Sequence, residues 1–198
     1  AAGAKDVTIT GAASYSLLSS GQSSIDCTGN VILENTGTGG ITSGGTFQLV
    51  HANNVTISGA STNALLASGG GSSLECSGKI MITNTKGAIS NGNSFTAIAH
   101  DMEITGNATD RGSMFSCTTV DLTGKGGDLS LTNNGSAPIV GGTSFTVAGA
   151  KNVALVGNYP STGYQEMLAV STVDIDCTGT LEVTNHDGGT IFSRNSFT

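Results

Sequence analysis

The amino-acid sequence predicts an all-β protein, a right-handed parallel β-helix (a solenoid) of about eight three-strand rungs. A nine-residue segment that begins with Cys and ends with Asn recurs along the chain, with one degenerate copy between the second and the last. The closing residues are 49, 49 and 52 positions apart: Asn35, Asn84, Asn133 and Asn185. A period of this length, with short apolar triplets, many turn residues and no helical periodicity, is typical of a solenoid. We therefore expect one β-helix domain, residues 1–198, that is a segment of a longer repeat array.

The composition excludes several classes of partner. The chain has 30 Gly, 2 Pro and no Trp, and its formal net charge is −7 with only 7 Lys and Arg. Nucleic acids and anionic membrane surfaces are bound by clustered basic residues, so we expect neither as a partner. No apolar run approaches the roughly 18 residues of a membrane span, so we expect no membrane insertion by this segment.

The first strand of each rung is an apolar–x–apolar triplet, the pattern of a strand with one buried face. The eight triplets lie at residues 7–9, 31–33, 55–57, 80–82, 102–104, 129–131, 153–155 and 181–183. Two residues after each triplet, Gly and Asn alternate strictly. Because both accept a positive φ readily, we expect a left-handed corner at each of them. A ladder of Asn side chains that hydrogen-bond from rung to rung is a further expectation.

Two more strands follow in each rung. The second contains a short, mostly apolar pair, and the third follows a bend rich in Gly and Ser. We expect one inward position of the third strand to alternate between an aliphatic residue and Phe, through Ile25, Phe47, Leu74, Phe95, Val120, Phe145, Ile175 and Phe197. Alternating large and smaller side chains fill a narrow interior without clashes between neighbouring rings. The 49-residue unit is therefore two rungs.

Three of the four cysteines share an inward position in this register, namely Cys27, Cys76 and Cys177, with Leu122 in place of the thiol on the fifth rung. Equivalent residues two rungs apart lie about 9.6 Å apart, whereas the Cα atoms of a disulfide lie roughly 4.4–6.8 Å apart. We expect four free thiols, three of them buried, with Cys117 elsewhere in its rung. No Cys-x-x-Cys pair occurs and the three His are scattered, so we predict no metal site.

Outward acidic residues form the first candidate binding face. Asp26, Glu75, Asp121 and Asp176 lie between inward neighbours on the third strand of the odd rungs, and Asp174 adds a second acid beside Asp176. Such a stripe suits the binding of a cation or a glycan. It equally suits a solvated face that spaces like charges two rungs apart to limit repulsion. The sequence leaves both interpretations open.

The longer loops at residues 107–114 and 159–167 are the second candidate, since insertions in a solenoid fall in loops and loops carry specific contacts. The candidate contact residues are Asp110, Arg111, Tyr159 and Tyr164. Catalysis gains no support, because Arg111 and Arg194 lie away from any acid cluster. The acidic residues also have no apolar pocket that would raise the pKa of a glycosidase acid. We therefore predict no catalytic residue and no cofactor.

Residues 188–191 are Gly-Gly-Thr-Ile and residues 192–195 are Phe-Ser-Arg-Asn, with weaker variants of the first at 86–89 and 39–42. In these tetrapeptides the chain resembles the chlamydial polymorphic membrane proteins, whose passenger domains repeat Gly-Gly-Ala-Ile-like and Phe-x-x-Asn motifs. The resemblance implies an autotransporter-type adhesin that is secreted to the outer membrane and exposed at the cell surface.

The leading functional prediction is an extracellular structural or adhesive module that attaches to a host-cell or glycan ligand through its loops and sheet faces. One alternative is a carbohydrate-active β-helix, similar to a polysaccharide lyase or hydrolase. A second is a filament module that self-associates end to end through unpaired backbone groups at its ends.

Overall fold

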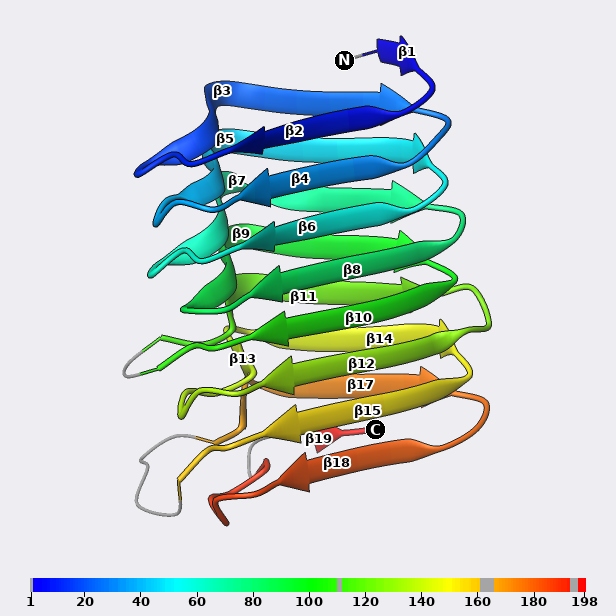
Figure 1. The fold of residues 1–198 in the computed structure, drawn as a ribbon. Coiled ribbons are helices and arrows are strands. Elements are labelled where there is room, and N and C mark those ends of the chain that lie inside the picture. The colour runs from blue at the N-terminus through cyan, green and yellow to red at the C-terminus, as the bar shows by residue number, and fades with distance from the viewer. Residues whose placement is uncertain (1, 110–111, 161–165, 193–195) are drawn as a thin grey trace.

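The computed structural model describes residues 2–109, 112–160, 166–192 and 196–198, and it confirms the predicted parallel β-solenoid. The described residues contain no helix that could span a membrane. Eight short strands form the sheet nearer the viewer in Figure 1, called the front sheet: β2 (Val7–Gly11), β4 (Val31–Asn35), β6 (Val55–Gly59), β8 (Lys79–Asn84), β10 (Asp101–Gly106), β12 (Asp128–Asn133), β15 (Asn152–Gly157) and β18 (Leu181–Asn185). Each pairs in parallel with the next, which gives about seven turns.

The rear sheet combines the predicted second and third strands. In the first five rungs they form one continuous strand, and they separate only from the sixth rung onward. Gly44, Gly71 and Gly92 allow the bend within these strands, with φ of 132°, 108° and 140°. The strands are β1 (Ala2–Ala4), β3 (Ser16–Cys27), β5 (Gly40–Ala52), β7 (Ala64–Cys76), β9 (Ala88–Ala99), β11 (Phe115–Gly124), β13 (Val140–Gly141), β14 (Ser144–Ala150), β16 (Leu168–Ala169), β17 (Thr172–Cys177) and β19 (Ser196–Phe197).

The solenoid is right-handed, as predicted. In Figure 1 the chain crosses the front sheet from right to left and returns through the rear sheet from left to right while it descends. Right-handed crossovers between parallel strands are the strong preference of twisted sheets. The turns from the front sheet to the rear sheet project on the left of this view.

The alternation of Gly and Asn at the end of each front strand has a different cause from the one predicted. None of these residues has a positive φ, and His51 (62°) is the only described non-glycine residue that has one. The predicted left-handed corner is therefore wrong. The glycines are required for space, because a Cβ atom on Gly59 would lie 2.5 Å from Leu65 Cδ1 and one on Gly106 would lie 2.6 Å from Met114 Cγ. The next part of the rung packs a large side chain over each glycine.

The asparagines instead hold the turns together. Asn84 Nδ2 donates to the carbonyl oxygens of Ala88 (2.7 Å) and Ser61 (3.0 Å), and Asn84 Oδ1 accepts the Lys86 N–H (3.4 Å). Asn84 therefore bonds two turns, the one that follows it in its own rung and the corresponding turn of the preceding rung. In the sheet each Asn lies beside the Gly of its neighbours, so the Asn ladder predicted here is wrong. Similar bonds are made by Asn35, Asn133 and Asn185.

A ladder of Asn and Asp side chains lies at the opposite corner, on the residue before the first apolar position of six of the eight front strands: Asp6, Asn30, Asn54, Asp101, Asp128 and Asn152. Asn54 Nδ2 donates to Asn30 Oδ1 (3.0 Å), and Asn152 Nδ2 donates to Asp128 Oδ1 (2.8 Å). The Asn30 N–H donates to Asp6 Oδ1 (2.8 Å). These bonds join successive rungs and satisfy corner amides that the sheet leaves unpaired.

The inward positions of the rear sheet alternate in size, but the register differs from the prediction. Val120 pairs with Phe95 and Phe145 as predicted, but Phe47 pairs with Ser23 and Ser72, and Phe145 pairs with Val173 on its other side. The expected partners Ile25, Leu74 and Ile175 lie two residues further along their strands. A shift of two residues keeps the same face inward, so apolar patterning alone does not fix it.

A second inward position of the rear sheet also alternates between large and small side chains, but it is large on the rungs where the first position is small. Leu66 pairs with Thr42 and Ser90, and Phe115 also pairs with Ser90. The Phe115 ring extends toward Phe95 of the neighbouring rung, with ring centroids 4.8 Å apart. Each of these rungs therefore contributes one large and one small side chain, which explains why the genetic repeat spans two rungs.

Ser72 is the weak point of this packing. Its hydroxyl is buried between the Phe47 and Phe95 rungs and has no hydrogen-bond partner among the described residues. We expect Ser72→Ala to raise the free energy of unfolding by about 1 kcal/mol, because it removes an unsatisfied buried hydroxyl. Ser90→Ala is the matched control and should lower it, since Ser90 Oγ donates to Leu66 O (3.3 Å). Urea unfolding measures both, and a less stable Ser72→Ala protein would contradict the expectation.

All four cysteines are free, as predicted. Cys27, Cys76 and Cys117 are at most 2% exposed, whereas Cys177 is half-buried. The expected equivalence of Leu122 with the thiols is wrong, because Leu122 pairs with Ala97 and Val147. The cysteine position is filled on other rungs by Ala52, Ala99, Gly124 and Ala150.

Thiol reactivity should follow this burial. Burial raises the pKa of Cys76 to about 11 and also raises the pKa of Cys117, which lowers the fraction of reactive thiolate. We expect one thiol, Cys177, to react rapidly with an aromatic disulfide reagent at pH 8 in the native protein. All four should react after unfolding without reductant. Rapid native labelling of Cys76, located by mass spectrometry, would contradict the packing.

Candidate binding groove

The five acidic residues of the predicted binding face do not lie in one stripe. Asp121 and Asp174 both pair with Thr146, so they share one outward row of the rear sheet. Asp26 and Glu75 lie in the next row, two residues further along their strands, where their partners are Val50 and Ile98. Asp176 is exposed near the end of β17. The rows place hydroxyl or apolar residues between the carboxylates, which keeps them apart.

Basic side chains also offset part of this acidity. Asp26 Oδ1 lies 2.9 Å from His51 Nδ1, and Glu75 Oε1 lies 3.7 Å from Lys125 Nζ. The hydrogen bond and charge of Asp26 raise the pKa of His51. The described residues contain no group of three or more His, Cys, Asp or Glu placed to hold a metal ion.

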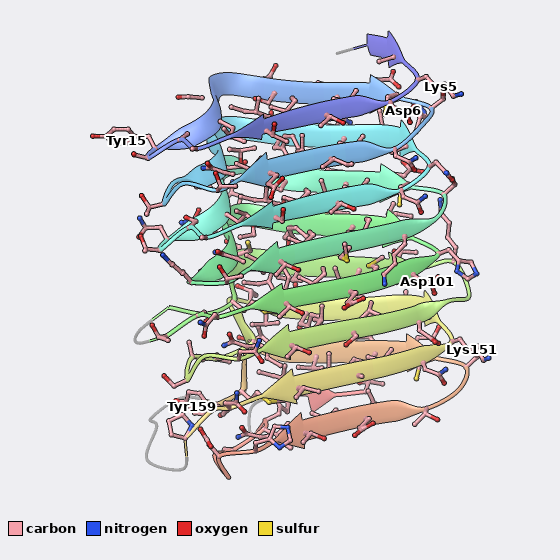
Figure 2. All side chains as sticks on the ribbon, in the orientation of Figure 1. Lys5, Asp6, Tyr15, Asp101, Lys151 and Tyr159 are labelled. Carbon is pink, nitrogen blue, oxygen red and sulfur yellow. The ribbon has the colours of Figure 1, made fainter. Side chains whose placement is uncertain are left out.

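The predicted loop contacts have mixed outcomes. Asp110, Arg111 and Tyr164 lie outside the described residues. Tyr159 is only 6% exposed, and its backbone N–H and carbonyl bond to Asn185 (2.8 and 2.9 Å), so this residue is largely buried. Figure 2 shows it beside the lower left corner of the solenoid.

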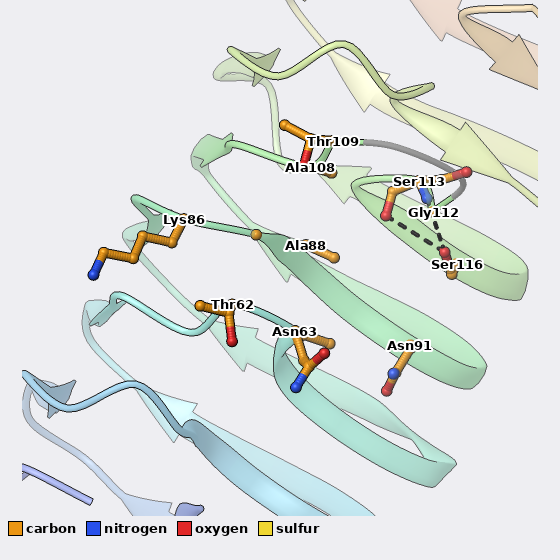
Figure 3. Close-up of a pocket in the computed structure, with 12 residues that line it drawn as sticks. Thr62, Asn63, Lys86, Ala88, Asn91, Ala108, Thr109, Gly112, Ser113 and Ser116 are labelled. Atoms are coloured by element: carbon orange, nitrogen blue, oxygen red, sulfur yellow. Dashed lines mark hydrogen bonds between the residues drawn. The ribbon is translucent and has the colours of Figure 1, made fainter. Parts of the chain in front are cut away.

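A groove runs along the left side of the solenoid, between the projecting turns and the outer surface of the rear sheet. It consists of two hollows, of about 280 and 210 Å³, that share Thr62, Asn63 and Ala64. The first continues along Lys86 to Ser116 on the fifth rung, and the second continues along Gly40 to Tyr15 on the first. Figure 3 shows the hollow on the third to fifth rungs. We call the whole feature the axial groove.

Small residues form the floor of the axial groove. Gly40, Ala64 and Ala88 begin successive rear strands. Close packing of the backbone requires small residues beside this floor, because a Cβ atom on Gly39 or Gly87 would collide with a carbonyl oxygen of the preceding turn. Since every turn lies tightly on the one before it, the hollow continues from rung to rung.

The inner wall is an outward row of the rear sheet. Ala67, Asn91 and Ser116 are register neighbours in β7, β9 and β11, and all three line the groove. Ser116 Oγ accepts the Ser113 N–H at 3.0 Å, a bond drawn in Figure 3, which fixes the end of the longer fifth-rung turn against the wall. The Lys86 ammonium extends away from the other lining residues. Among the described residues, the surface inside is therefore uncharged and rich in hydroxyl and amide groups.

The sequence predictions did not identify the axial groove, because its residues are small, polar and distributed over five rungs. One signal was present, since Gly or Ala begins three successive rear strands, β5, β7 and β9. Neither a scan against models of protein families nor comparisons with curated proteins and with solved structures found a match for this chain.

Proposed function

We propose that the chain is a surface-exposed structural and adhesive β-helix module that binds an extended ligand along the axial groove. The observation that carries this proposal is the groove, whose described lining is uncharged inside and which crosses the first five rungs parallel to the solenoid axis. A rigid stack of rungs with two adjoining hollows along it suits attachment to a long polymer or to a decorated cell surface. The tetrapeptides that resemble chlamydial passenger domains are consistent with location at a cell surface.

Binding of the fluorescently labelled chain to cultured epithelial cells tests the proposal. Ala67→Arg places a long side chain across the groove and should abolish binding. Ala148→Arg is the matched control, because Ala148 is also a half-buried outward residue of the rear sheet but lies outside the groove. Equal binding by both variants would overturn the assignment of the groove.

Two further measurements separate the other functions considered. Release of reducing sugar from polysaccharides, lost on substitution of Asp121 or Asp176, would replace the adhesive function with a catalytic one. Filaments that form at raised concentration in electron micrographs, with no cell binding, would indicate a self-associating module.

A further inference from the structure

We propose that the ligand of the axial groove is a linear neutral glycan, with Tyr15 as a stacking platform at one end. This inference rests on the proposed function and specifies the ligand of the same groove. The chemistry of the lining, the position of Tyr15 and the length of the groove each favour such a ligand.

The lining matches the hydrogen-bonding groups of sugars. Thr62, Asn63 and Asn91 are exposed side chains that offer a hydroxyl, which both donates and accepts, and amides with a donor and an acceptor end. Sugar hydroxyls also donate and accept, so such a surface suits them along their length. An anionic polymer would find little compensation, because the Lys86 ammonium extends outward and the chain carries a net charge of −7.

Tyr15 supplies the apolar contact that neutral sugars require. Its side chain is 92% exposed, the largest exposure of any large hydrophobic residue described, and it projects beyond the turn of the first rung in Figure 2. It lines the same hollow as Asn63 and Ala64. An exposed ring with a polar hydroxyl packs against the C–H face of a pyranose while the hydroxyl stays in water.

The length of the groove favours a polymer. From the first rung to the fifth it covers four steps of about 4.8 Å, or about 19 Å, along the axis. The floor residues Gly40, Ala64 and Ala88 leave room for a chain to lie along this direction. A compact ligand would contact only one of the two hollows, whereas an oligosaccharide of several units would contact both.

Calorimetric titration of the folded chain with β-1,4-glucan hexaose and with the hexamer of N-acetylglucosamine tests the inference directly. We expect binding of at least one hexamer and much weaker binding of its dimer. Tyr15→Ala should weaken the affinity roughly five- to tenfold, while Tyr15→Phe should retain it. Ala67→Arg should abolish binding, and Ala148→Arg should leave it unchanged. If Ala67→Arg does not fold, Asn91→Ala, which removes an exposed amide without added volume, should weaken binding several-fold.

The outcomes separate this inference from the proposed function. Cell binding that depends on Ala67 but is not competed by either hexamer would overturn the glycan assignment and leave the adhesive function standing. Tighter binding of an anionic polymer such as polygalacturonate would overturn the neutral specificity. Hexamer binding that Ala67→Arg does not change would place the glycan elsewhere and overturn the inference.

Discussion

Substitution of Asn84 by Asp should lower the free energy of unfolding by about 3–5 kcal/mol at neutral pH. Asn84 is 1% exposed, and its Nδ2 donates to the carbonyl oxygens of Ala88 and Ser61. A carboxylate has no hydrogen to donate, so those oxygens would face a buried negative charge. The amide therefore determines whether the third and fourth turns can stack.

The pH dependence of the Asn84→Asp protein gives a sharper test than its stability alone. Burial beside carbonyl oxygens should raise the folded-state pKa of the new carboxyl above its usual range. The destabilisation should therefore be small at low pH, where the acid is neutral in both states, and grow as the pH rises through the unfolded-state value. Urea unfolding at pH 4 and pH 7 measures this difference relative to the unmodified protein.

Asn107→Asp is the matched control. Asn107 is half-buried, and its amide makes an exposed bond to Thr85 O (3.0 Å). The carboxylate of the Asn107→Asp protein would be solvated, so we expect its free energy of unfolding to change by less than about 1 kcal/mol. Equal losses at the two sites would show that the Asn84 bonds do not hold the turns.

The fold could be predicted because a solenoid repeats its sequence pattern at every rung. Triplets such as residues 55–57 and 80–82 lie where expected, in β6 and β8. The backbone at the corners could not be predicted in the same way. Asn and Gly suit a positive φ, but they also suit a buried amide that binds carbonyls and a position with no room for a Cβ atom. Only the neighbours in the folded solenoid, from the same rung and from the preceding one, distinguish these causes.

The register of the rear strands and the axial groove could not be predicted for a related reason. Pairing of Phe47 with Ser72 instead of Leu74 preserves the inward face, so no polarity rule separates the two registers. The groove arises from small floor residues and polar lining residues that are distributed over five rungs. The shape of the groove depends on how far each turn projects from the solenoid. The identity of a residue such as Ala64 or Asn91 within its own strand does not indicate that distance.

Gly59→Ala is the second substitution with a large expected effect, a loss of about 2–3 kcal/mol in the free energy of unfolding. The new Cβ atom would lie 2.5 Å from Leu65 Cδ1 and 3.3 Å from Asn35 O. Leu65 is fully buried, so its side chain cannot move outward to relieve the overlap. Gly21→Ala is the control, since a Cβ atom there has nothing within 4 Å and the change should be nearly neutral.

A double-mutant cycle with Leu65 identifies the cause of that loss. Leu65→Ala alone should cost about 2–5 kcal/mol through the cavity that it leaves. In the double variant the methyl group added at position 59 would occupy part of this cavity, so the combined loss should fall well below the sum of the two single losses. Chemical unfolding of the four proteins gives the coupling energy. Additive losses would mean that backbone strain, and not contact with Leu65, requires glycine at the end of the odd front strands.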